Sequence, residues 1–148
     1  MISKTLTYLD YDGVEHTKEF YFSMNQTEFA LLNNTIPGGF DNYLRKIQED
    51  HNEEKLLELL TMFIVEGYGE RLPDGGFIKE DENGRKLGKM FLRTEACDNL
   101  LTELLEKENN IGAFLTRMMP ASVQGKLAEN MKEATEKLSA APEFPAAN

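Results

Sequence analysis

The sequence predicts an α+β domain in which an N-terminal β-hairpin packs on a mostly α-helical body of about five to six helices. Two observations carry this prediction. Apolar side chains alternate around a turn signal in residues 2–22, and they recur at helical spacing through most of residues 25–119. A hairpin alone is only marginally stable, so one of its faces must pack on the helices that follow.

The composition limits the functions open to this chain. Its 148 residues carry 26 Asp and Glu against 16 Lys and Arg, which gives a formal net charge of −10. The length fits one domain, and 41% hydrophobic residues are enough to bury a core. The acidic excess is spread along the chain and no segment forms a basic stripe. Binding to nucleic acid or to anionic lipid is therefore not expected.

The N-terminus and the cysteine count favour a soluble, cytosolic protein. The first residues lack the basic and apolar regions of a signal peptide, and no apolar run is long enough to cross a membrane. The single cysteine, Cys97, cannot form a disulfide within the chain. We therefore expect a protein of a reducing compartment with no membrane attachment.

The hairpin is expected over residues 2–22. Ile2, Leu6 and Tyr8 lie on one face of an extended segment, and the turn signal Asp12-Gly13 follows. A second alternating run then leads from Val14 to Phe22. Two such runs around an Asp-Gly turn predict antiparallel strands.

The helices are expected to begin at polar caps and to end at glycines. Asn25, three residues before Glu28, resembles a capping box, and Pro37-Gly38-Gly39 interrupts the helix that it opens. Asn52 can cap the next helix, which Gly67 and Gly69 end. We expect this helix to be the most buried, because its apolar residues cover more than one stripe: Leu56, Leu57, Leu59, Leu60, Phe63 and Ile64.

Turn signals dominate residues 70–88, where Phe77-Ile78 is expected to anchor a loop to the core. Helix resumes by about Lys89, Thr94 can cap the following run, and Asn109 or Asn110 restarts a helix that Pro120 stops. We therefore predict one α+β domain over residues 1–120, with helices over about 25–119. A weak C-terminal helix is expected over 121–139 and a disordered tail over 140–148.

Two segments approach a ligand-binding motif without completing it. Residues 84–90 resemble a phosphate-binding loop, but the glycine spacing is one residue short and Met90 occupies the Ser or Thr position. Residues 79–84 imitate a calcium loop, but Lys79 stands at the first ligand position. We expect a solvated loop in both cases, with no cofactor and no metal ion.

No catalytic constellation is recognisable either. His16 is expected on a strand surface, His51 at a helix boundary, and Cys97 as a small core residue. A Cys-His pair would have to be assembled by the fold. The glutamates of residues 53–66 are spaced as a polar helix face. The prediction is a protein that is not an enzyme.

Ten short motifs resemble, in order and spacing, the tail assembly chaperones of long-tailed bacteriophages and prophages. They are Met1-Ile2-Ser3-Lys4-Thr5, Tyr11-Asp12-Gly13-Val14-Glu15, Phe20-Tyr21-Phe22, Thr27-Glu28, Pro37-Gly38-Gly39, Tyr68-Gly69, Phe77-Ile78-Lys79, Thr94-Glu95-Ala96, Ala113-Phe114 and Met119-Pro120. The resemblance covers about residues 1–120 and leaves 121–148 outside it. Cys97 departs from it, because an aromatic residue is usual there, and residues 83–89 form a longer or more basic loop.

The resemblance implies a non-catalytic assembly factor made in the host bacterial cytoplasm. Such chaperones keep the helical, aggregation-prone tape-measure protein soluble while tail-tube subunits polymerise around it, and they are absent from the mature virion. The implied partners are the tape-measure protein, the tail-tube protein and a longer, frameshifted form of the chain itself. The acidic composition agrees with this role, because a charged body can suppress association of an apolar client.

The client surface is expected among flexible apolar side chains near the end of the domain. Leu104, Phe114, Met118 and Met119 form a dense apolar set at helical spacing, and Met and Leu suit adaptable contacts with partner helices. The same pattern is also typical of ordinary core. Charged substitutions distinguish the two, because only a core would collapse.

Two other functions stay open. A tail-completion or connector subunit would be a structural part of the virion. A small phage-encoded enzyme or an inhibitor used in host takeover is the third possibility, and a pocket that joined Cys97 to a histidine would favour the enzyme.

Overall fold

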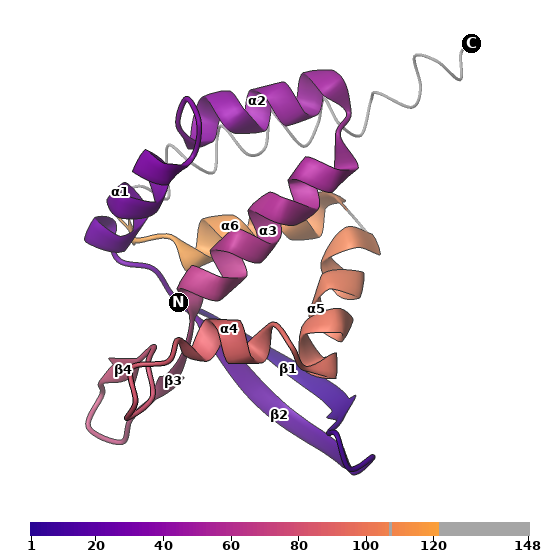
Figure 1. Cartoon of the computed structure of the whole chain (residues 1–148), viewed down its shortest axis with the longest axis vertical. Helices are drawn as coiled ribbons and strands as arrows, with labels where there is room; N and C mark the ends of the chain where they lie inside the picture. Colours follow the sequence, from indigo (N-terminus) through magenta and orange to yellow (C-terminus); the bar gives the residue numbers. More distant parts are fainter. Residues whose placement is uncertain (107, 122–148) are drawn as a thin grey trace.

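The chain folds as an α+β domain, as the sequence predicts (Figure 1). The computed structural model describes residues 1–106 and 108–121. The N-terminal hairpin leads into three helices, a short second hairpin and then three more helices. Of the weak helix expected over 121–139, residues 122–139 lie outside the described residues, and so does the tail expected over 140–148. None of the described helices is both long and apolar enough to cross a membrane.

The sheet has four antiparallel strands in the order β1-β2-β3-β4. Their bounds are β1 Ile2–Leu9, β2 Glu15–Phe22, β3 Tyr68–Arg71 and β4 Phe77–Ile78. The long hairpin is paired along its whole length, from Ile2 opposite Phe22 to Leu9 opposite Glu15. In contrast, β2 pairs with β3 only through Tyr21 and Phe22. The distal half of the hairpin therefore extends beyond the rest of the sheet (Figure 1).

The predicted restart of a helix at Asn109 or Asn110 is wrong, because that helix begins at Glu108. The described residues contain six helices, three of which begin at predicted caps. They are α1 Gln26–Thr35, α2 Phe40–Asp50, α3 Glu53–Gly67, α4 Leu87–Phe91, α5 Glu95–Glu106 and α6 Glu108–Met118. The Asn25 side chain accepts from the Glu28 N–H while the Glu28 carboxylate accepts from the Asn25 N–H, which completes the capping box. Asn52 caps α3 through the Lys55 N–H, and the Thr94 hydroxyl accepts from the Cys97 N–H at the start of α5.

The first turns of α3 are less buried than the rest of the helix. Leu59, Leu60, Phe63 and Ile64 are fully buried, whereas Leu57 is exposed. Leu57 is thus one of the six apolar residues behind the prediction of a deeply buried helix, and it does not contribute to that burial. Because Leu57 lies in the first turns of α3, near the corner with α2, it is farther from the centre of the domain than the second half of the helix.

The second hairpin corrects the prediction of a plain loop over residues 70–88. It contains β3 and β4, and a further bridge joins Glu80 to Lys86. Phe77 lies across Gly69, where a side chain would come within 2.5 Å of the Phe77 ring, while Ile78 is exposed. Phe77 thus packs on the sheet as expected, and Ile78 does not anchor the loop.

Lys79 supplies the anchor that was expected of Ile78. Its ammonium donates to the Ser23 carbonyl oxygen at 2.6 Å, to Glu28 Oε2 at 2.8 Å and to the Glu66 carbonyl oxygen at 2.9 Å. These acceptors belong to the end of β2, the start of α1 and the end of α3. A second ion pair, from Lys86 to Glu66, holds the same loop. One lysine thus joins three elements to the second hairpin.

The same five-residue turn occurs three times, at residues 10–14, 72–76 and 81–85. In each, the first N–H donates to the fifth carbonyl oxygen and the fourth N–H donates to the first carbonyl oxygen. The fourth residue is always a glycine with positive φ: Gly13, Gly75 and Gly84. This conformation costs glycine little, which explains why the same Asx-Gly signal recurs at all three turns.

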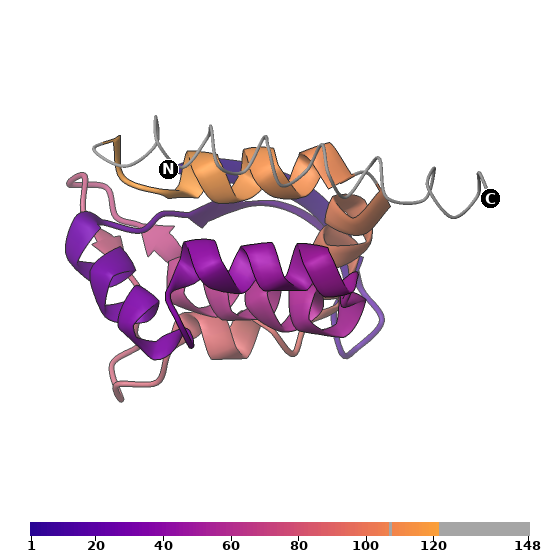
Figure 2. The same ribbon diagram turned by 90° about the horizontal axis from the view of Figure 1, so that it is seen from above.

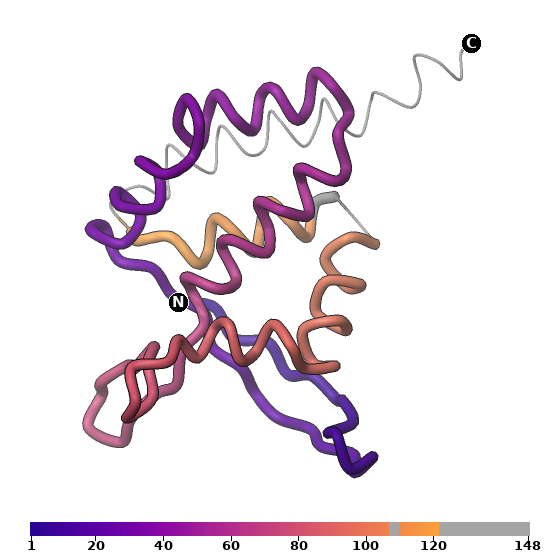
Figure 3. The backbone as a smooth tube through the Cα atoms, in the orientation of Figure 1, coloured from indigo at the N-terminus to yellow at the C-terminus, as the bar shows by residue number. Residues whose placement is uncertain are grey.

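The core lies between the hairpin and α3, with the last two helices closing it. Figure 2 shows α6 beside the hairpin on one side of the molecule and α2, α3 and α4 on the other. The Phe22 ring contacts Phe91 of α4 and Phe114 of α6, with centroid separations of 5.6 and 5.2 Å. The backbone trace in Figure 3 shows that the N-terminal hairpin lies beside α5 and α6, at the other end of the described chain.

The α3–α4 contact depends on a glycine. A Cβ at Gly88 would lie 2.0 Å from the carbonyl oxygen of Val65 and 2.7 Å from its carbonyl carbon. These are backbone atoms, which cannot turn away as a side chain can. Gly88, in the segment that resembles a phosphate-binding loop, therefore allows α3 and α4 to approach each other closely.

Candidate binding surface

The four residues expected to bind a client lie in the core. Leu104, Phe114, Met118 and Met119 are at most 1% exposed. The Met24 N–H donates to the Met118 carbonyl oxygen at 3.0 Å, which fixes the end of α6 against the start of α1. A Cβ built at Gly67 would lie 2.5 Å from the Met118 sulfur. They therefore do not form an exposed ridge, because Phe114 packs on Phe22 of β2, Met118 lies beside Gly67 of α3, and Leu104 and Met119 are buried as well. Client binding by them stays a prediction.

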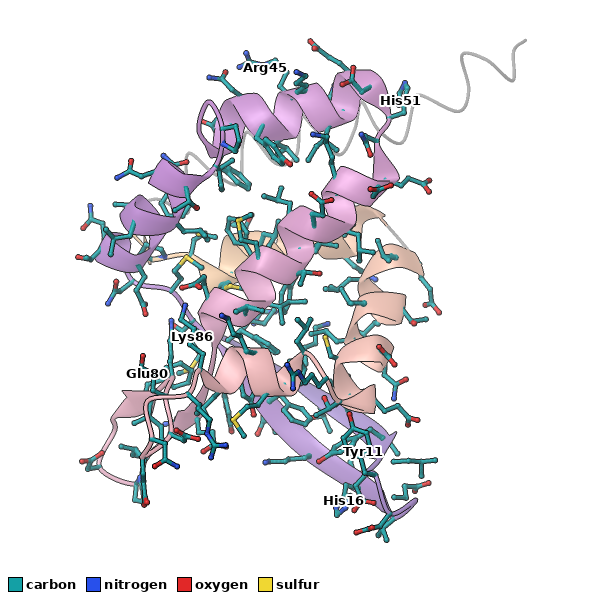
Figure 4. All side chains as sticks on the ribbon, in the orientation of Figure 1. Tyr11, His16, Arg45, His51, Glu80 and Lys86 are labelled. Atoms are coloured by element: carbon teal, nitrogen blue, oxygen red, sulfur yellow. The ribbon has the colours of Figure 1, made fainter. Side chains whose placement is uncertain are left out.

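The tip of the long hairpin carries the exposed apolar side chains that a binding surface needs. Tyr11 is 89% exposed, Val14 53% and Leu9 45%. All three lie in or beside the turn of residues 10–14. Figure 4 shows Tyr11 near the end of the hairpin that projects from the body. We call Leu9, Tyr11 and Val14 the tip surface.

Hydrogen bonds to the α4–α5 junction hold the tip surface in place. The Leu9 N–H donates to Glu95 Oε1 at 2.8 Å, and the Tyr11 hydroxyl donates to the Arg93 carbonyl oxygen. Leu92, one residue before Arg93, is also exposed. The tip is thus a supported apolar projection, and ordering it on binding would cost less than ordering a free loop.

Asp10 and His16 contact each other at the base of the tip. Asp10 Oδ2 lies 2.7 Å from His16 Nε2, and the His16 ring stacks on Tyr8. The hydrogen bond from His16, followed by that from the Val14 N–H, lowers the pKa of the Asp10 carboxyl below its usual value. This pairing rigidifies the turn and leaves its apolar side chains facing solvent.

The histidines and the cysteine, which are the candidate catalytic residues, lie apart from one another. His16 contacts Asp10 and Tyr8, His51 is the exposed C-cap of α2, and Cys97 is buried near the start of α5. Within residues 1–106 and 108–121 no contact joins Cys97 to either histidine. Desolvation raises the pKa of the Cys97 thiol to about 11, with a smaller contribution from Asp98. A buried thiol of raised pKa is a poor nucleophile.

Native Cys97 is expected to resist thiol reagents. A shift of the pKa from 9.0 to about 11 leaves on the order of 100-fold less thiolate at pH 8, and burial slows access further. Reaction with Ellman's reagent, followed by absorbance, should be slow in buffer, faster toward pH 11 and fast in urea. The Cys97→Ser variant gives the background rate. Rapid reaction of the native protein at pH 8 would contradict a buried, protonated thiol.

In the loop of residues 81–85, the Asp81 carboxylate accepts hydrogen bonds from within the loop itself. Asp81 accepts from the Asn83 and Arg85 N–H groups and from Arg85 Nε, all at 2.8 to 2.9 Å. These bonds, that of the Arg85 N–H first, lower the pKa of the Asp81 carboxyl. In the part of the chain that the structure describes, no cluster of three or more acidic, His or Cys side chains is placed to hold a metal ion.

Sequence reasoning missed the tip surface although its residues were visible. Tyr11 and Val14 flank the Asp12-Gly13 turn signal, and an apolar residue at a turn is usually exposed. The density of apolar residues over 100–119 pointed instead to the core. An isolated aromatic in a turn was the signal that could have located the surface.

Comparison with known proteins supports one family. A family model described as "Phage tail assembly chaperone" matches residues 1–147. The match continues past residue 120, so the expectation that residues 121–148 fall outside the resemblance is wrong. No curated protein and no solved structure matched the chain.

Proposed function

Because the chain belongs to the phage tail assembly chaperone family, we propose that it binds the tape-measure protein of its phage and keeps it soluble while the tail tube assembles. It does so by binding, without catalysis, in the cytoplasm of the infected bacterium, and it leaves before the virion is complete. The family match over residues 1–147 is the observation that carries this proposal.

The tip surface is proposed as one place where the client binds. Exposed tyrosine and branched aliphatic side chains on a supported turn suit contact with an apolar helix face. The net charge of −10 would keep the complex from associating further once the client's apolar surface is covered. The tail-tube protein and a longer form of the chain are further partners that this role implies.

Co-expression tests the proposal. The chain is expected to raise the soluble yield of the tape-measure protein and to co-purify with it. Replacing Tyr11 and Val14 with serine should reduce co-purification by about tenfold, a loss typical of interface anchors. Leu31→Ser is the matched control, since Leu31 is 63% exposed on α1, away from the tip.

Three outcomes separate the alternatives. An unchanged yield with no co-purification would contradict the chaperone function. A normal yield with the tip variant would leave the function standing and reject the tip surface. Stoichiometric amounts of the chain in purified virions, measured by mass spectrometry, would favour a structural tail-completion or connector subunit.

A further inference from the structure

One edge of the long hairpin is covered and the other is open. On the covered edge, Asn99 Nδ2 donates to the Thr7 carbonyl oxygen at 2.8 Å, and Glu95 accepts from the Leu9 N–H. These side chains of α5 occupy outward-facing backbone groups of β1. Such capping protects an edge strand from pairing with another chain.

The register identifies the backbone groups on the open edge. The Asp10 N–H donates to the Val14 carbonyl oxygen, so the even-numbered residues of the hairpin pair across β1 and β2 and the odd-numbered ones face outward. The Ser23 N–H confirms this, since it points away from β1 and donates to Gly67. The outward residues of the distal half of β2 are therefore Glu15, Thr17 and Glu19.

These three residues form the open edge of β2. Pairing with β3 stops at Tyr21, and residues 15–19 are all exposed. Among the described residues, no hydrogen bond from another element reaches the outward N–H and C=O groups of Glu15 and Thr17, and the β2–β3 ladder ends at Tyr21, two residues past Glu19. Five residues span about 17 Å, the length of an ordinary strand.

The side chains on this edge favour a partner strand with basic residues. Glu15 and Glu19 lie on the outer face with Thr17 between them. If two copies paired antiparallel over the whole edge, Glu15 of one would face Glu19 of the other, and like charges directly opposite are destabilising. A strand with lysine or arginine at alternate positions would instead place a cation opposite each glutamate.

We propose that the open edge of β2, Glu15 to Glu19, binds an extended, basic segment of a partner protein by adding it as a strand beside β2. Backbone hydrogen bonds to this edge supply the affinity, and the carboxylates of Glu15 and Glu19 select the basic side chains. The Glu19 carboxylate also accepts a hydrogen bond from the Tyr21 hydroxyl at 2.8 Å, so Glu15 is the more accessible of the two. This site adjoins the tip surface, because Glu15 follows Val14 and pairs with Leu9, but the proposal does not depend on which client the tip binds.

A synthetic peptide tests the proposal on the full chain. The probe is a capped peptide of about seven residues in which lysine alternates with valine or threonine. Its binding should slow amide hydrogen exchange at Glu15, Thr17 and Glu19, which NMR resolves residue by residue. The same peptide N-methylated on its edge-facing residues should bind about tenfold more weakly or not at all, because it lacks the donors.

Substitutions in β2 give a matched pair. Thr17→Pro removes an outward N–H that β1 does not use, while Thr17→Val removes only the hydroxyl that contacts Thr7. We expect about a tenfold loss of peptide binding in the proline variant and little change in the valine variant. Glu15→Gln combined with Glu19→Gln should weaken binding and reduce its salt dependence.

Several results would overturn the proposal. Equal binding of the N-methylated and parent peptides would exclude strand addition, even if the proline variant fails to fold. Equal binding of a peptide with glutamate in place of lysine would exclude selection by charge. A stable dimer in sedimentation that protects the same three amides would assign the edge to a second copy of the chain.

Discussion

Met118→Lys is expected to unfold the domain. The Met118 side chain is fully buried between α6 and α3, and its sulfur occupies the space beside Gly67. Burying an unpaired ammonium there costs several kcal/mol, a large part of the roughly 5–15 kcal/mol that stabilises a typical domain. Phe114→Ala should cost about 3–5 kcal/mol through loss of packing alone. Urea denaturation followed by circular dichroism measures both.

Ala113→Lys is the matched control for this prediction. It introduces the same charge into the same helix at an exposed position, so its free energy of unfolding should stay close to that of the parent chain. If Met118→Lys proves as stable as Ala113→Lys, α6 is not a fixed part of the core. The set Leu104, Phe114, Met118 and Met119 would then be accessible to a client after all.

Gly88→Ala is expected to destabilise the domain by about 3 kcal/mol, at the upper end for overpacking by one methyl group. The new Cβ would sit 2.0 Å from the Val65 carbonyl oxygen, so α4 must move away from α3. That movement would disturb Phe91, whose ring stacks on Tyr68 with centroids 4.7 Å apart. The free energy of unfolding from urea denaturation measures the loss.

Gly76→Ala is the control for the crowded glycine. A Cβ there would approach only side-chain atoms, Asp74 Oδ1 and Leu72 Cδ1, at 3.1 Å. Both side chains belong to an exposed turn and can shift, so a change within about 1 kcal/mol is expected. Equal stability of the Gly88→Ala and parent proteins would show that α4 is not held against α3.

Local signals were sufficient to predict most of the architecture. The Asp12-Gly13 turn set the register of the long hairpin, and Asn25, Asn52 and Thr94 cap helices as their side chains suggest. These features depend on hydrogen bonds between residues a few positions apart. A single sequence displays such bonds directly.

Features that depend on distant residues were not predictable in the same way. Strands β3 and β4 have four and two residues, too few to show an alternation, and β3 exists because Tyr21 and Phe22 pair with it. The burial of Met118 depends on Gly67, which is adjacent to it in space but far away in the sequence. Helical periodicity identifies an apolar face without saying whether core or client covers it.

The packing of the first hairpin on the last helices has a consequence for synthesis on the ribosome. Turn 10–14 can form within microseconds once both strands have emerged, because its contacts are local. The contact of Phe22 with Phe114 and the ion pair of Lys4 with Glu103, however, can form only after the last helices have been synthesised. The domain therefore closes late in translation, and a nascent chain that stops before α6 leaves uncovered the part of the hairpin's apolar face that Phe114 contacts.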